Sequence, residues 1–591
     1  MLSGPLFRKE MIRYLLLEKK YTEEDIARRK AMEDEDKVKY GLLIRDARLE
    51  KMEAGEWEND PVKWVLSVPE NYTKLRPGDT VKLCQEGRRD AEGTVLENKA
   101  DLLVLQVYGY YGARGALYRV EIEEKCFLDH FIYCLDHIQP ESDGMRFLSL
   151  MTGETKPESD SPREVIPDAE ITESLLSRLN EQQRRACEIA FRCPSLHCIQ
   201  GPPGTGKTDV LAAIALGFVE AGYSVVVLAG THQAVNNALA KISARRPETC
   251  TVKIGDPLRA TELDSEAIYK MSFNDYKHEL LSSVSECFYG DVIGITIHSA
   301  VWHLGARDFS FPHPLGSRSF VILVDEAGQM PLGHAACIGT FGARSVILIG
   351  DDKQMPPIFH EKMRDDPLSV SAFRYITTAH PEHKTRLSVT YRLNEPIARL
   401  VSRAFYETDG EALVASDFSK DRRLSLPLPE APGTVRSVLA SEEALLSVNP
   451  STGEEWEDFN AEEADFVAEL VRSAAQGGMN YKDIAVITPY RRQVRTIREK
   501  VLALNPQADE MLMDTVERLQ GQDVDMIIIS FSVSSPDYFE EVREFILNPN
   551  RLNVMLTRAK RKVIIVGSSV VLAALKERYG IVGSEFLASG V

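Results

Sequence analysis

Residues 197–208 of this chain read HCIQGPPGTGKT, a stretch typical of a buried strand, a glycine-rich loop and the start of a helix. It contains the complete pattern GxxxxGK[ST]. Glycines let successive backbone N–H groups turn inward around phosphate oxygens, and the helix that follows directs its positive dipole end there. We expect Lys207 to neutralise the β- and γ-phosphates of a nucleoside triphosphate, and the Thr208 hydroxyl to hold Mg²⁺. The alternative is a glycine-rich turn that binds nothing.

The composition places the chain among globular proteins of several domains, with 591 residues, 44% hydrophobic and 27% charged. A formal net charge of −19 argues against a protein coated in positive charge, such as a histone-like binder. It leaves room for a local basic channel that binds nucleic acid. The sequence contains no apolar run long enough to span a bilayer, and the first residues do not resemble a signal peptide. We therefore expect an intracellular protein, cytoplasmic or nuclear if eukaryotic, with no membrane partner.

The periodicity of apolar residues changes along the chain and predicts its organisation. We expect a helical stalk over 1–58, with Thr22 capping a charged helix that runs to about Trp57. We expect a small β-barrel over 59–140 and a linker rich in Ser, Pro, Glu and Asp over 141–172. Two α/β domains would follow over 173–380 and 381–591, the first with a short helical insertion at about 256–289.

Short β-branched runs without alternation predict parallel strands that are covered on both faces. In the first α/β block these runs are 195–200, 224–229, 291–296, 320–325 and 345–350; in the second they are 483–488, 524–531 and 562–567. The phosphate loop is in the first block and the second block has none. We therefore expect the second block to complete the site of the first.

Two of these strands end in polar residues that suit phosphate chemistry. The strand at 320–325 runs into Asp325 and Glu326, at the strand end where open α/β sheets hold their ligands. We expect Asp325 to hold the Mg²⁺ shell and Glu326 to orient or deprotonate the attacking water. After the strand at 345–350, the Gln354 amide is expected to contact the γ-phosphate.

The second block supplies Arg392 and Arg558, each within a short polar segment. An arginine inserted from another domain can neutralise the charge that develops during hydrolysis. These arginines would make hydrolysis depend on closure of the two blocks.

An ordered series of motifs links these residues. They are LNEQQ (179–183), GPPGTGKT (201–208), AGTHQAVNNAL (229–239), DEAGQ (325–329), GDDKQMPP (350–357), RLSVTYRLN (386–394), ITPY (487–490), VERLQGQDVD (516–525) and RLNVMLTR (551–558). The series resembles that of the superfamily 1 helicases. Within that superfamily, the series resembles specifically the branch typified by the nonsense-mediated-decay RNA helicase, the immunoglobulin-switch-region binding helicase and the replication helicase–nuclease. The chain departs from the family at Thr231-His232, where Ser-Asn is commoner, and at Gln522-Asp523, where Arg-Glu is commoner.

The resemblance implies two tandem RecA-like motor domains and a role for each matching residue. Gln183 would read adenine, Tyr391 would stack near it, and Asp523 would lie near the ribose. The implied catalytic residues are Lys207, Glu326, Gln354, Arg392 and Arg558, with Thr208 and Asp325 on the metal. The nucleotide-binding residues are Gln183, Gly201, Pro202, Pro203, Gly204, Thr205, Gly206, Lys207, Thr208, Tyr391 and Asp523. The residues that track the nucleic acid would be Thr231, Thr296, Ser299, Pro489, Thr515 and Gln520.

The expected activity is ATP- and Mg²⁺-dependent movement along single-stranded nucleic acid, 5′→3′ by resemblance, with duplex unwinding. DNA is favoured over RNA, and the chain is expected to act as a monomer. The alternative is an ATP-gated clamp or remodelling scaffold that binds a strand without unwinding. A metabolic P-loop kinase would phosphorylate a small acceptor, and the second block with its arginines argues against it.

Overall fold

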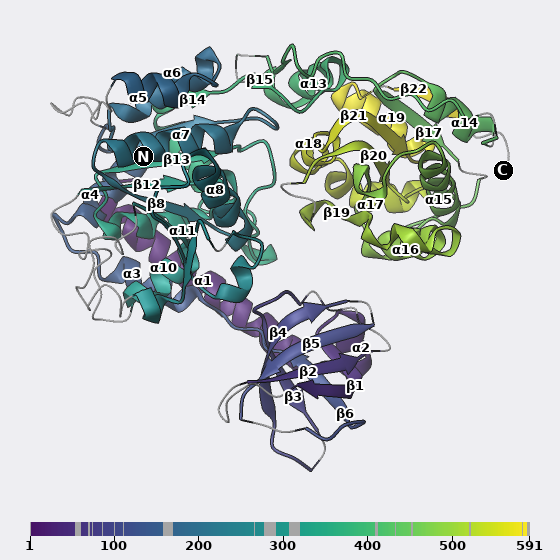
Figure 1. The fold of residues 1–591 in the computed structure, drawn as a ribbon, viewed down its shortest axis with the longest axis horizontal. Coiled ribbons are helices and arrows are strands. Elements are labelled where there is room, and N and C mark those ends of the chain that lie inside the picture. Colours follow the sequence, from purple (N-terminus) through teal and green to yellow (C-terminus); the bar gives the residue numbers. More distant parts are fainter. Residues whose placement is uncertain are drawn as a thin grey trace.

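The structure is a computed structural model of the full chain. It describes all residues except 1, 54–60, 69–70, 72, 74, 86, 100, 110–111, 158–168, 265, 277–290, 306–318, 408–409, 411, 429, 432, 451–452, 519–521, 582 and 588–591. Two α/β bodies lie beside each other and a small barrel lies below them (Figure 1).

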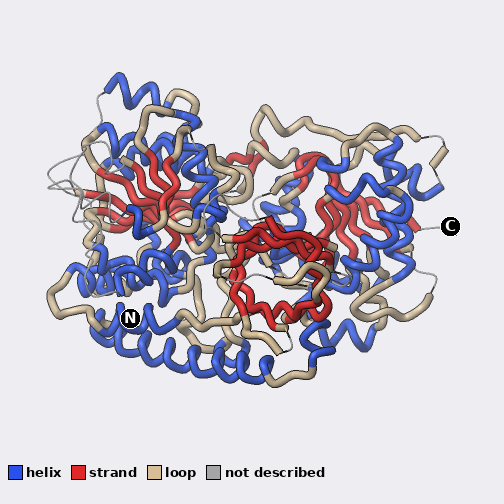
Figure 2. The backbone as a smooth tube through the Cα atoms, turned by 60° about the horizontal axis from the view of Figure 1, so that its bottom comes forward, coloured by secondary structure: helices blue, strands red, loops and turns tan. Residues whose placement is uncertain are grey.

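The barrel is a closed ring of antiparallel strands in the order β1-β2-β5-β4-β3-β6, seen end-on in Figure 2. Its strands are β1 (Leu43–Glu53), β2 (Val62–Ser67), β3 (Thr80–Cys84), β4 (Ala91–Asn98), β5 (Leu102–Val107) and β6 (Leu117–Ile122). Trp64 and Tyr118 fill its interior, with ring centroids 5.1 Å apart. Large aromatic side chains of this kind allow a small barrel to bury a core of its own.

The first α/β body is built on an eight-stranded parallel sheet in the order β10-β9-β11-β8-β12-β13-β7-β14. Its strands are β7 (Leu196–Gln200), β8 (Ser224–Ala229), β9 (Thr251–Ile254), β10 (Tyr269–Met271), β11 (Val292–Thr296), β12 (Phe320–Val324), β13 (Ser345–Gly350) and β14 (Lys384–Arg386). One face packs against α6 (Glu181–Phe191), α7 (Lys207–Glu220) and α8 (His232–Arg245). Because all strand pairs are parallel, the carboxyl ends of β7, β12 and β13 meet at one edge.

The opposite face of this sheet carries α1 (Gly4–Lys30), α3 (Leu128–Asp136), α4 (Asp143–Met151), α10 (Ile297–Gly305), α11 (Leu332–Ala336) and α12 (Ala372–Ala379). Helix α1 buries Phe7, Met11 and Leu15 in that core. Its far end reaches α2 (Asp34–Lys39) and the barrel (Figure 2). The long helix therefore connects the barrel to the first α/β body.

The second α/β body has a six-stranded parallel sheet in the order β19-β18-β20-β21-β17-β22. Its strands are β17 (Leu445–Asn449), β18 (Ile484–Thr488), β19 (Leu512–Thr515), β20 (Val524–Ser530), β21 (Ala559–Val566) and β22 (Ser584–Leu587). One face packs against α13 (Glu395–Val401), α17 (Pro536–Ile546), α18 (Pro549–Leu556) and α19 (Ser569–Tyr579), and the other against α14 (Gly433–Ala440), α15 (Ala461–Gln476) and α16 (Arg491–Leu504). A two-stranded ladder of β15 (Val389–Thr390) and β16 (Val414–Ala415) lies where the chain passes between the bodies (Figure 1).

This architecture confirms the predicted fold class: two tandem RecA-like parallel-sheet domains preceded by a helix and a small β-barrel. None of the described helices has the length and apolar character needed to cross a membrane.

The prediction of helix throughout 1–58 was wrong for its last part. Leu43–Glu53 is strand β1, which pairs with β2 and β6. Its charged side chains alternate with buried Ala47 and Leu49, so the charges that suggested a solvated helix line the outside of a barrel strand. Thr22 is no cap, because it lies inside α1 and its Oγ1 donates to Glu18 O at 2.8 Å. Trp57 lies outside the described residues.

Two further expectations differ from the structure. The stretch expected to be a linker contains α4, which Ser142 caps and which buries Phe147 and Leu148. Hydrophobic periodicity was present there, but the neighbouring polar residues obscured it. The insertion expected to be helical is helical only in part: its described residues form a 3₁₀ turn, Pro257–Ala260, the edge strand β10 and helix at 273–276, while residues 277–290 lie outside the described part.

Candidate active site

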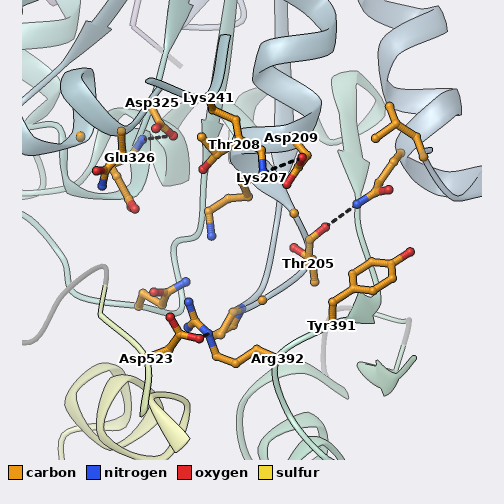
Figure 3. A pocket seen from close by; sticks show the side chains of 18 of the residues that line it. Thr205, Lys207, Thr208, Asp209, Lys241, Asp325, Glu326, Tyr391, Arg392 and Asp523 are labelled. Carbon is orange, nitrogen blue, oxygen red and sulfur yellow. Dashed lines mark hydrogen bonds and ion pairs between the residues drawn. The ribbon is translucent and has the colours of Figure 1, made fainter. Parts of the chain in front are cut away.

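The glycine-rich loop leaves the carboxyl end of β7 and enters α7 (Figure 3). Gly204 and Gly206 have φ of +73° and +77°, a left-handed conformation that side chains other than glycine rarely adopt. Lys207 Nζ donates to Gly201 O at 2.6 Å, so the ammonium folds back over the loop. The loop therefore presents backbone N–H groups and one cation to the same space, as an anion site requires.

Asp325 and Glu326 follow β12 at the same edge of the sheet. The Asp325 carboxylate accepts from Glu326 N at 2.9 Å, and Glu326 Oε2 accepts from Gln329 Nε2 at 3.1 Å. Burial, and then the neighbouring Glu326, raise the pKa of Asp325 to about 7. Glu326 itself has φ of +50°, a strained conformation for a residue with a side chain, of the kind that clusters at active sites.

Gln354 follows β13 and is buried between the two bodies. Its Nε2 donates to Asp351 Oδ2 at 2.7 Å, while its Oε1 accepts from Arg558 Nη2 at 3.3 Å. Arg558 is 3% exposed, and burial followed by repulsion from Arg392 lowers its pKa to about 9. The guanidinium therefore remains charged near neutral pH but lacks a close carboxylate partner among the described residues.

Arg392 enters the cavity from the segment after β15 (Figure 3). Its Nη1 donates to Thr557 O at 3.2 Å, and its Nε lies 3.8 Å from Asp523 Oδ2. Lys560 Nζ lies 3.1 Å from the same Asp523 oxygen. Asp523 thus holds two cations of the second body at the mouth of the site.

The opposite end of the cavity is shaped by Gln183 and Tyr391. Gln183 forms a capping box with Asn180, and its Nε2 also donates to Thr205 O at 2.9 Å. The Tyr391 hydroxyl accepts from Asn180 Nδ2 at 2.9 Å, and Tyr391 N donates to Gly204 O at 2.8 Å. The tyrosine ring is partly exposed, as a stacking surface must be.

Most of these side chains line one cavity of about 940 Å³. The predicted residues that line it are Gln183, Pro203, Gly204, Thr205, Gly206, Lys207, Thr208, Asp325, Glu326, Gln354, Tyr391, Arg392, Asp523 and Arg558. Gly201 and Pro202 do not line the cavity and contribute through the backbone of the loop. The structure therefore brings residues of both bodies to one site.

Sequence reasoning missed several polar residues in this cavity. Asp209 accepts from Arg245 Nη2 at 2.9 Å and lies 3.0 Å from Lys241 Nζ (Figure 3). Lys241 and Arg245 are four residues apart on α8, a spacing that places both on one face of the helix. That spacing was the available signal. Arg178, Arg422 and Lys560 complete the basic lining.

The resemblance to the superfamily 1 helicases implies a magnesium ion, and the residues present fit it. Thr208 and Asp325 line the same cavity as the phosphate loop. A hydroxyl and a carboxylate are oxygen donors of the kind Mg²⁺ prefers, with phosphate oxygens and water as the remaining ligands. The described residues contain no group of three or more His, Cys, Asp or Glu that could hold a metal alone, so such an ion would be shared with the nucleotide.

The residues expected to track nucleic acid lie at carboxyl ends of other strands. In the first body, Thr231 follows β8, and Thr296 is the last residue of β11. In the second body, Pro489 follows β18, and Thr515 is the last residue of β19. Thr231 Oγ1 accepts from Ala234 N, and Thr296 Oγ1 donates to Ser299 Oγ at 2.9 Å. Thr296 and Thr515 are buried. Gln520 lies outside the described residues, and the contacts of all six residues with a strand stay a prediction.

Comparison with known proteins agrees with this arrangement. Two sequence profiles of families described as "AAA domain" match residues 178–422 and 368–570. The DNA replication ATP-dependent helicase/nuclease dna2 of Schizosaccharomyces pombe is 28% identical over 438 residues, which are 70% of this chain and 29% of that protein. The Xenopus laevis protein DNA2 is 29% identical over 426 residues, 68% of this chain and 38% of that protein.

The chain spans about a third of the length of these relatives. A solved Arterivirus nonstructural protein 10 (helicase) aligns over 88% of this chain and 80% of its own, at 14% identity and a TM-score of 0.38. The ordered motifs, the two profile matches and the curated relatives agree. Together they support a superfamily 1 helicase, of the branch that includes the nonsense-mediated-decay RNA helicase and the replication helicase–nuclease.

Proposed function

We propose that this chain hydrolyses ATP and uses the energy to move 5′→3′ along single-stranded nucleic acid and to open duplexes. The observation that carries the proposal is that one cavity is lined by the phosphate loop of the first sheet and by Arg392 and Arg558 of the second body. A site divided in this way is sensitive to the distance between the bodies. Binding and hydrolysis of ATP would close and release them.

The roles within the site follow from chemistry and position. Lys207 and the loop N–H groups bind the β- and γ-phosphates, and Glu326 orients the attacking water. Arg392 and Arg558 neutralise charge that develops on the γ-phosphate, with Gln354 beside them. When bound, Mg²⁺ held by Thr208 and Asp325 supplies charge neutralisation on the phosphate oxygens. Gln183 and Tyr391 contact the base, and Asp523 lies toward the ribose.

We further propose DNA as the preferred strand and a monomer as the working form. The first of these is supported by relatives whose names specify DNA replication. The strand would cross the carboxyl ends of the two sheets, near Thr231, Thr296, Ser299, Pro489 and Thr515, and Gln520 is predicted from the sequence to contact it as well.

The proposal is tested with tailed DNA and RNA duplexes of both polarities, measured for ATP-dependent strand displacement beside ATP turnover. Displacement of a duplex with a 5′ single-stranded tail is the expected result. ATP turnover with no displacement on any duplex would instead favour the ATP-gated clamp or scaffold. Phosphate transferred to a small acceptor would support a kinase and contradict both.

A further inference from the structure

Tyr406 is a buried residue of the second body that no motif of the family includes. It ends the π-helix η8 (Ser402–Tyr406), which directly follows α13. The side chain is fully buried, with its ring packed in the core of the second body. Short π-helices are rare and are often found at functional sites. The position of the hydroxyl shows what this one does.

The Tyr406 hydroxyl joins the two bodies through two hydrogen bonds. It donates to Asp351 Oδ2 at 2.6 Å, in the segment that carries Gln354. It accepts from Asn553 Nδ2 at 2.8 Å, in helix α18. A hydroxyl has one hydrogen to donate, so these two bonds fix its direction.

The hydrogen bonds continue from Asp351 back to the second body. Asp351 Oδ2 also accepts from Gln354 Nε2 at 2.7 Å, and Gln354 Oε1 accepts from Arg558 Nη2 at 3.3 Å. Arg558 lies five residues after Asn553. The hydrogen bonds therefore form a circuit. It runs from Asn553 in α18 through Tyr406 to Asp351 and Gln354 of the first body, and from Gln354 back to Arg558, just after α18.

This circuit determines the orientation of the Gln354 amide. The Asp351 carboxyl oxygens accept every hydrogen bond that they form within the described residues, so Asp351 selects the NH₂ end of the amide and leaves the amide oxygen facing Arg558. Tyr406 holds the Asp351 oxygen in place from one side, and Lys353 N holds the other oxygen at 3.1 Å. Loss of the hydroxyl would release that oxygen and, through it, the amide.

We propose that Tyr406 is a positioning residue for ATP hydrolysis. Through Asp351 it fixes the orientation of the Gln354 amide, and through Asn553 it couples that orientation to α18, the helix before Arg558. The inference rests on the proposed ATP hydrolysis. Tyr406 does not line the nucleotide cavity, so it acts on turnover without touching the nucleotide. ATP binding is carried by other residues and does not depend on it.

The test is Tyr406→Phe, which removes the hydroxyl and keeps the ring. We expect kcat for ATP to fall about ten- to a hundredfold while KM for ATP changes by about twofold or less, because misplacement of a reacting group lowers turnover more than binding. The matched control is Tyr14→Phe on α1. It removes the hydroxyl of another buried tyrosine, which is hydrogen-bonded to Ser369 Oγ at 2.8 Å. That variant is expected to keep the wild-type kcat.

Combination with Gln354→Ala separates positioning from general damage to the fold. If Tyr406 acts through Gln354, Tyr406→Phe lowers kcat no further in a Gln354→Ala background. An equal fold-loss in both backgrounds would overturn the inference. Asn553→Ala removes the donor to the Tyr406 hydroxyl and is expected to lower kcat more than it changes KM, as Tyr406→Phe does. This variant replaces Tyr406→Phe in the test if Tyr406→Phe fails to fold.

The two proposals fail in different ways. A wild-type chain that hydrolyses no ATP under any condition contradicts the proposed function. A wild-type chain that does hydrolyse ATP, beside a Tyr406→Phe variant of equal kcat, contradicts the role of Tyr406 alone.

Discussion

Gln354 and Arg558 are hydrogen-bonded across the interface between the two α/β bodies, with 3.3 Å between Oε1 and Nη2, although they are 204 positions apart in sequence. Gln354 lies in the segment that follows β13 of the phosphate-binding sheet, and Arg558 directly precedes β21 of the other sheet. Asn550 Nδ2 donates to Asp352 O at 3.1 Å beside them and also to Gln354 O. The segment after β13 therefore meets α18 at the nucleotide cavity. A change in the distance between the bodies would separate Gln354 from Arg558.

Replacement of Arg558 by alanine is expected to lower kcat for ATP about 10³-fold, because an arginine that neutralises charge in the transition state contributes at least that much. Binding of ATP is expected to change only severalfold, since Lys207 and the loop remain. Steady-state turnover and equilibrium nucleotide binding measure the two effects. Arg561→Ala is the matched control, because Arg561 pairs with Asp525 at 3.2 Å outside the cavity. Equal losses of turnover and binding in Arg558→Ala would contradict this role.

Gly204 marks a close approach between the two halves of the site. A Cβ there would lie 2.4 Å from Arg392 Cβ and 2.6 Å from Thr390 Oγ1. Gly204→Ala is therefore expected to displace Arg392 and to lower ATP turnover about a hundredfold or more.

Gly222→Ala provides a control with similar backbone strain and no collision. Gly222 has φ of +84°, and nothing lies within 4 Å of its added Cβ. It should lower stability by about 1–2 kcal/mol, the cost of a left-handed conformation, and leave kcat unchanged. Similar kcat values for the two alanine variants would show that the contact with Arg392 is unimportant.

Glu463 predicts a pH-dependent contribution to stability. It is buried in α15, where Oε2 accepts from Ser530 Oγ at 2.7 Å and Ser532 N at 3.0 Å. Burial raises its pKa to about 7, from an ordinary value of 4.5, and outweighs these hydrogen bonds. The folded chain then binds the extra proton between these two pH values. The stabilisation that the protonated form provides is present below pH 4.5 and is lost as the pH rises through 7.

Glu463→Gln removes this titration and keeps the shape of the protonated side chain. Between about pH 5 and 7 the free energy of unfolding of the wild type should fall relative to the variant, by up to about 1.4 kcal/mol per pH unit. Denaturant unfolding at several pH values measures the difference. Parallel curves for the two proteins would show that Glu463 stays ionised in the fold.

The parts of the fold that the sequence predicted are those with strong local signals. The runs at 224–229 and 345–350 match β8 and β13, because continuous β-branched residues rarely occupy anything but a buried strand. The short strands β9 and β14 were missed, since Thr251–Ile254 and Lys384–Arg386 are brief and partly polar. Their strand geometry comes from neighbours in the sheet, which a local pattern does not contain.

The same distinction applies to the site. Lys207, Asp325 and Glu326 could be assigned because each follows a recognisable strand and the chemistry of phosphate binding restricts the residue types. Tyr406 could not be assigned, because its role depends on Asp351 and Asn553, 55 and 147 residues away. Asp209 with Lys241 and Arg245 also requires the packing of α7 against α8. Contacts of this kind become visible only when the helices are placed in space.

The most direct test of the account is the rate of ATP hydrolysis by the purified chain with Mg²⁺, with and without single-stranded DNA or RNA, for the wild type and Lys207→Ala. We predict hydrolysis that rises with added single strands, more with DNA than with RNA, and that is lost in Lys207→Ala while the fold persists. Turnover that no single strand alters, or that Lys207→Ala retains, would contradict the account.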